Sequence, residues 1–87
     1  MQNKSIVFLS SQLLSNRNLE RFGFNYLLKN GWSIYYFECS YIFRKNYYES
    51  VKNEENLNTN FFYRIKTYKE LLSRLEKIKP DFVENIL

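Results

Sequence analysis

Residues 4–40 decide the fold of this chain, because two β-prone runs, KSIVFLS at 4–10 and WSIYYFEC at 32–39, enclose one helical segment, LERFGFNYLLK at 19–29. The first run is continuously apolar and rich in β-branched and aromatic residues, which is typical of a strand that helices cover on both faces. Apolar residues in 19–29 recur at helical spacing, and Asn30-Gly31 supplies the left-handed residue that ends a helix. The pattern predicts a parallel β-α-β unit with a right-handed crossover.

Two finer expectations concern this helical segment. Asn16 or Asn18, in the polar stretch 11–18, is expected to cap a single helix over 19–29. Gly23 lies on the apolar stripe of that helix, where the missing side chain is expected to let the helix approach the sheet closely.

The same alternation continues to the end of the chain. Apolar residues between Tyr41 and Val51 could build a short helix, and 53–60 is expected to be a polar loop. Residues 61–65 predict a short third strand, and 81–87 a fourth.

A second helix is predicted over 68–79. Thr67 and Glu70 match a capping box, in which the Thr hydroxyl accepts from the third helical amide and the Glu carboxylate accepts from the Thr amide. Glu70 and Arg74 form an i,i+4 pair, and Pro80 ends the helix. The expected buried stripe consists of Tyr68, Leu71, Leu72, Leu75 and Ile78.

Together these elements predict an α/β fold, a Rossmann-like half with a parallel sheet of about four strands in the order 3-2-1-4 and flanking helices. Two or three helices barely cover both faces of such a sheet. We therefore interpret residues 1–87 as one α/β unit, a fragment or an N-terminal domain, to which more chain or another subunit adds.

Composition excludes several classes of site. The 87 residues contain no histidine, which rules out Ser–His and Cys–His hydrolases within this chain. Cys39, the only cysteine, has no partner for a disulfide or a zinc site and is expected to be a small buried residue. We predict no catalytic residue, no metal and no cofactor. The apolar N-terminal run is too short for a signal peptide or a membrane span, so a cytoplasmic location is expected.

Candidate ligand-binding residues follow from the fold, because doubly wound sheets bind ligands beyond the carboxyl ends of their strands. Ser11, Arg17 and Arg21 follow the first strand, and Glu38 ends the second. The arginines could contact a phosphate, or simply be solvated, and Glu38 could accept from a ribose hydroxyl. The first loop contains no glycine, so neither a dinucleotide fingerprint nor a P-loop is present.

The net charge of +4 equals the excess of basic over acidic residues within 61–79. This segment could be a solvated helix face, or it could contact an anionic membrane through Arg64, Lys66, Lys69 and Lys77, placing the protein at the inner face of the membrane. Nucleic acid is not expected as a partner, because no recognition motif accompanies the charge.

Residues 4–10, 19–40 and 68–83 resemble the N-terminal domain of GT-B glycosyltransferases of the family 4 kind. The Glu20–Gly23 run and the acidic-x-Ser ending at 38–40 are similar to bacterial proteins of surface-polysaccharide biosynthesis. The resemblance implies an acceptor-side domain for a glycan or lipid-linked acceptor. The nucleotide-sugar donor and the catalytic groups belong, in that family, to a C-terminal domain that these residues do not include. The family's glycine pair after the first strand is missing.

A stand-alone interaction module of flavodoxin-like or receiver-like topology, without enzymatic activity, is the alternative. The chain lacks the acidic cluster and phospho-acceptor Asp that a receiver needs after its first strand.

Overall fold

The computed structural model describes residues 4–53 and 61–87 and shows one parallel sheet in the order β3-β2-β1-β4. The strands are β1 (Ser5–Ser10), β2 (Ser33–Glu38), β3 (Phe62–Arg64) and β4 (Phe82–Asn85). All three strand pairings are parallel. The predicted α/β class, strand order and parallel arrangement are confirmed.

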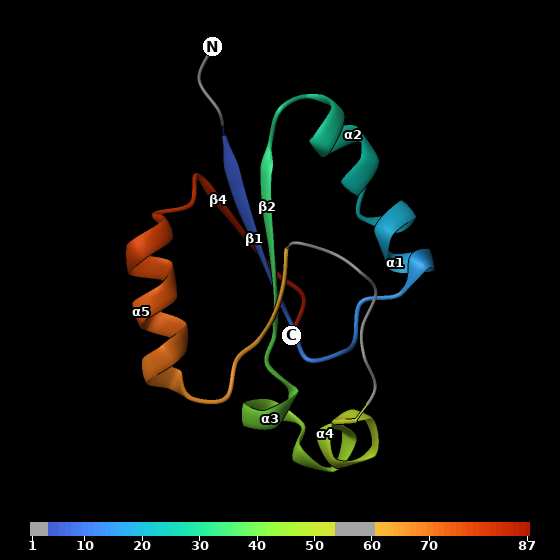
Figure 1. Ribbon diagram of the computed structural model, residues 1–87, viewed down its shortest axis with the longest axis vertical. Helices are drawn as coiled ribbons and strands as arrows, with labels where there is room; N and C mark the ends of the chain where they lie inside the picture. The colour runs from blue at the N-terminus through green and yellow to red at the C-terminus, as the bar shows by residue number, and fades with distance from the viewer. Residues whose placement is uncertain (1–3, 54–60) are drawn as a thin grey trace.

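Helices cover both faces of the sheet (Figure 1). On one side lie α1 (Asn16–Arg21) and α2 (Phe24–Lys29), and on the other lies α5 (Tyr68–Ile78). Two short helices, α3 (Ser40–Phe43) and α4 (Lys45–Val51), follow the carboxyl end of β2. Most of the predicted loop at 53–60 lies outside the described residues.

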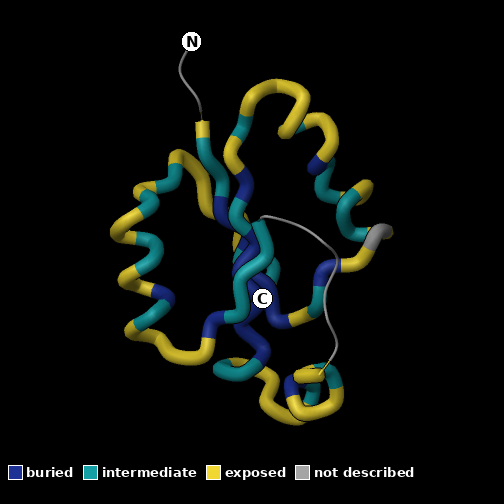
Figure 2. Tube along the Cα trace, in the orientation of Figure 1, coloured by how far each residue is buried: buried dark blue, intermediate teal, exposed yellow. Residues whose placement is uncertain are grey.

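The two faces of the sheet carry separate cores because successive strand residues point to opposite faces. Val7, Phe37 and Leu71 belong to the core under α5, whereas Phe8, Tyr36 and Phe24 belong to the core under α2. The buried residues concentrate on the central strands and at their carboxyl ends (Figure 2). Each of the four residues of β4 is exposed.

The prediction of one helix over 19–29 is wrong, since α1 and α2 are separated at Gly23. Gly23 has φ +68°, a left-handed conformation that glycine adopts without the penalty of a Cβ. A Cβ added there would meet no atom within 4 Å, so its role is backbone conformation and not close approach to the sheet. The cap is also different from the prediction: the Ser15 side chain accepts from the Asn18 amide at 3.1 Å.

The start of α5 follows the predicted capping box in its first half only. The Thr67 hydroxyl accepts from the Glu70 amide at 3.0 Å, but the Glu70 carboxylate accepts from the Lys66 amide rather than from that of Thr67. Glu70 and Arg74 form the expected ion pair at 3.3 Å.

The stripe predicted to be buried on α5 is narrower in the structure. Leu71 is buried and Leu75 and Ile78 are half-buried, but Tyr68 and Leu72 are 59% and 64% exposed. The helix ends at Ile78, where Lys79 adopts the left-handed conformation that commonly follows a helix.

Candidate functional site

Four buried polar side chains, all serine or glutamate, meet at one edge of the sheet within residues 4–53 and 61–87. They are Ser10, Ser11, Glu38 and Ser40. Ser10 and Glu38 are paired in register as the last residues of β1 and β2, and the other two side chains follow directly. The carboxyl edge of the central strands is therefore the polar part of an otherwise apolar interior, at the place where doubly wound sheets bind ligands.

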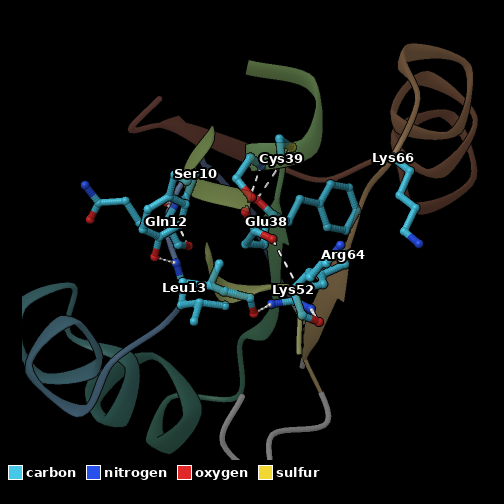
Figure 3. A network of polar contacts seen from close by, with 12 residues as sticks. Ser10, Gln12, Leu13, Glu38, Cys39, Lys52, Arg64 and Lys66 are labelled. Carbon is cyan, nitrogen blue, oxygen red and sulfur yellow. Dashed lines mark hydrogen bonds and ion pairs between the residues drawn. The ribbon is translucent and has the colours of Figure 1, made fainter. Parts of the chain in front are cut away.

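Glu38 is held by two elements besides its own strand (Figure 3). Its Oε1 accepts from the Ser40 amide at 2.7 Å, and its Oε2 lies 3.4 Å from Arg64 Nε at the end of β3. The two other guanidinium nitrogens of Arg64 donate to the carbonyls of Val51 and Lys52, at 2.8 and 2.6 Å. A buried ion pair thus joins β2, β3 and the end of α4.

Some buried polar atoms at this edge have no hydrogen-bond partner. They are Glu38 Oε2, Arg64 Nε and Ser40 Oγ. Buried polar groups are normally satisfied, so an unsatisfied hydroxyl beside a buried carboxylate marks a place where a further donor or acceptor could bind.

The β1–α1 loop is fastened to its neighbours by tyrosine hydroxyls. The Tyr36 hydroxyl donates to the Gln12 carbonyl at 2.9 Å, and the Tyr47 hydroxyl of α4 accepts from the Leu13 amide at 2.9 Å. Burial raises the pKa of Tyr36 to about 12, so its hydroxyl remains a neutral donor at physiological pH. These bonds hold the loop against β2 and α4.

A hollow of about 400 Å³ lies where α3 meets α4, next to this loop, and is lined by residues 43–47. The Arg44 guanidinium stacks over Tyr47 at 4.7 Å, and the Lys45 ammonium lies 5.0 Å from the ring of Tyr41. The hollow combines cationic groups with aromatic faces. This hollow was not predicted, although a basic and aromatic run directly after a predicted strand end is a usable signal.

The structure places the four predicted site residues in two groups. Ser11 and Glu38 lie together at the carboxyl edge and are buried. Arg17 and Arg21 are exposed on α1, and the counter-charge of Glu38 is Arg64 instead. Glu38 and Arg64 are register partners at the ends of β2 and β3.

The described residues offer no reactive thiol, no metal-binding cluster and no membrane-spanning helix. Cys39 is fully buried, and burial raises its thiol pKa to about 12, which leaves almost no reactive thiolate. Nowhere in this part of the chain do three or more His, Cys, Asp or Glu residues group so as to hold a metal ion. No helix in it has the length and apolarity to cross a bilayer.

The basic residues of 61–79 include one that contacts the buried network and several that are exposed. Arg64 is turned inward onto Glu38, whereas Lys66, Lys69 and Lys77 are exposed. Figure 3 shows Lys66 pointing away from the Glu38 network.

Comparison with family models, curated proteins and solved structures found no match to this chain.

Proposed function

We propose that this chain is the acceptor-side, N-terminal part of a glycosyltransferase-like protein of surface glycan biosynthesis, and that it is not catalytically complete by itself. The observation that supports this proposal best is the cluster of buried polar side chains at the carboxyl ends of β1 and β2. Polar groups buried at that edge, and not elsewhere in the described core, fit a ligand-binding edge.

The groups around the edge suit a phosphorylated or acidic glycan. Phe43, which lines the hollow and is 41% exposed, offers an apolar face for a sugar, and the Arg44 guanidinium, stacked over Tyr47, offers paired donors for a phosphate. The chain has no histidine and its thiol is buried, so neither an imidazole nor a reactive thiolate is available at this edge. Holding an acceptor is therefore the role proposed, and the donor would bind elsewhere.

Exposed lysines on α5 and directly before it could contact an anionic membrane, which supports a lipid-linked acceptor. Lys66, Lys69 and Lys77 are free of the Glu38 network and would contribute about 1 kcal/mol each near an anionic leaflet.

An NMR titration of the isotope-labelled chain tests the proposal. A phosphorylated oligosaccharide is expected to shift the amide signals of Gln12, Ser40 and Tyr47, and UDP- and GDP-sugars are expected not to bind at micromolar concentration. The variant Arg44→Gln should weaken glycan binding about tenfold, whereas Lys29→Gln, an exposed basic residue on α2, should leave it unchanged.

Two results would contradict the proposal. One is micromolar binding of a nucleotide-sugar measured by calorimetry, because the donor site should be absent. The other is glycan binding that Arg44→Gln does not weaken.

A further inference from the structure

The backbone of the β1–α1 loop is fixed at Gln12 by the two central strands. The Gln12 amide donates to Ser10 Oγ at 3.1 Å, and the Gln12 carbonyl accepts from the Tyr36 hydroxyl at 2.9 Å. Serine commonly makes the first of these bonds, to the residue two positions on, where a loop begins. Ser10 ends β1 and Tyr36 belongs to β2, so both backbone polar groups of Gln12 are held by the sheet.

The side chain of Gln12, by contrast, takes no part in holding the fold. It is exposed, and no hydrogen bond formed within residues 4–53 and 61–87 involves its carboxamide. Figure 3 shows this side chain extending away from Glu38. A carboxamide can donate and accept, as a sugar hydroxyl also can. A fixed backbone that carries an unused carboxamide is suited to recognising such a hydroxyl.

Tyr47 connects this loop to the hollow at residues 43–47. Its hydroxyl accepts from the amide of Leu13, the residue after Gln12, at 2.9 Å, and the Arg44 guanidinium lies over its ring at 4.7 Å. Arg44 directly precedes α4, and Tyr47 lies in the first turn of that helix. One side chain thus contacts both the loop and the arginine of the hollow, so it determines how the two are placed relative to each other.

The other end of α4 is held as well. Arg64 of β3 donates to the carbonyls of Val51 and Lys52, at 2.8 and 2.6 Å. The helix is therefore fastened at its start through Tyr47 and at its end through Arg64. A ligand that reaches from the hollow to the loop would meet groups already in place, which reduces the entropy lost on binding.

We propose that the β1–α1 loop is the second wall of the ligand site, in which Gln12 is a specificity-determining residue that binds a hydroxyl of the sugar. Tyr47 is the positioning residue, because its bond to Leu13 places the loop relative to Arg44. This inference rests on the proposed function, which assigns the phosphate of the same glycan to Arg44. A site that pairs a hydrogen-bonding group with a hydroxyl discriminates against ligands without that hydroxyl.

NMR titrations of the full chain with two probes, a phosphorylated oligosaccharide and inorganic phosphate, test this assignment. Gln12→Ala should weaken oligosaccharide binding about fivefold, through loss of one neutral hydrogen bond, and leave phosphate binding unchanged. Arg44→Gln should weaken binding of both probes, because it removes the paired donors. Asn25→Ala, which removes an exposed carboxamide from α2, is the matched control and should change neither.

Tyr47→Phe separates positioning from packing, since phenylalanine keeps the ring beside Arg44 and removes only the hydroxyl that accepts from Leu13. It should weaken oligosaccharide binding about as much as Gln12→Ala does. The double variant should bind no more weakly than either single variant, because both changes remove the same contact. A purely structural role for Tyr47 would weaken binding of both probes alike. Circular dichroism must show native helix content for each variant.

The outcomes distinguish this inference from the proposed function. If Arg44→Gln weakens oligosaccharide binding and Gln12→Ala does not, this inference is overturned and the proposed function stands. Equal weakening of both probes by Gln12→Ala would overturn it too, since the side chain would then act on the fold and not on the sugar. Additive losses in the double variant would overturn the positioning role of Tyr47. If Arg44→Gln has no effect, the proposed function fails and this inference fails with it.

Discussion

Replacing Arg64 by glutamine should destabilise the chain by about 3 kcal/mol, because it leaves Glu38 buried without its counter-charge. Across 3.4 Å two unit charges attract by about 5 kcal/mol at an effective dielectric constant of about 20, and desolvation offsets part of this. Removing one member of a buried pair costs about 3 to 5 kcal/mol. We expect the lower end, since the Arg64 side chain is 21% exposed.

Thermal and urea unfolding followed by circular dichroism measures this change. A loss of about 3 kcal/mol corresponds to a fall in Tm of about 15 °C for a chain of this length. The free energy of unfolding of small domains is about 5 to 10 kcal/mol, so the variant should still fold in the cold.

The double variant Glu38→Gln with Arg64→Gln separates the ion pair from the bonds that Arg64 donates to Val51 and Lys52. If the ion pair matters, the double variant is more stable than the two single effects added together predict, by about 2 kcal/mol. If only the carbonyl bonds matter, Glu38→Gln alone changes little and the effects simply add. A loss of stability below about 1 kcal/mol for Arg64→Gln would refute this account of the pair.

Three further predictions concern single residues. Gly23→Ala should lower the free energy of unfolding by about 1 to 2 kcal/mol, because alanine disfavours φ +68°. Gly23→Asn should lower it by less. Equal losses for the two variants in urea melts would contradict a backbone cause. Glu70→Ala should cost about 0.5 to 1 kcal/mol at pH 7 through loss of the cap. The bond from the Lys66 amide lowers the pKa of the Glu70 carboxyl below its ordinary 4.5. The stability that Glu70 contributes is therefore present above pH 4.5 and is lost as pH falls through the lowered pKa. The difference in stability between the unmodified chain and Glu70→Ala should vanish when both are melted in acid. Burial raises the thiol pKa of Cys39 to about 12. The thiol should therefore react with a thiol reagent at pH 8 only as fast as the chain unfolds. Rapid labelling of the folded chain would count against that burial.

The sheet could be predicted from the sequence because β1 and β2 contain apolar runs bounded by polar residues, and the alternation of β-prone and helical segments favours parallel strands. The break at Gly23 could not be predicted in the same way. Its apolar neighbours keep helical spacing on both sides, and only the φ of one residue distinguishes two helices from one. The exposure of Leu72 also depends on tertiary position, because no described strand lies beyond β4 to cover it.

The buried residues of the candidate site could be predicted from the sequence, but the hollow beside them could not. Ser11 and Glu38 follow from where strands end, whereas the pairing of Glu38 with Arg64 depends on the register of β2 against β3, which the sequence pattern does not fix. The hollow between α3 and α4 depends on how two very short helices turn against each other, and hydrophobic periodicity carries no signal for segments of 4 and 7 residues.

The buried network at the carboxyl edge connects the segments that surround the proposed ligand-binding edge. Arg64 links β3 to α4, Glu38 links β2 to the start of α3, and Tyr47 links α4 to the β1–α1 loop. The β1–α1 loop, the stretch from β2 to α4, and β3 are thereby fixed around one edge. An apolar core of the same volume would be at least as stable as a buried ion pair. We therefore interpret the polar network as a means of positioning this edge, so Arg64→Gln should weaken glycan binding even in the cold, where the variant remains folded.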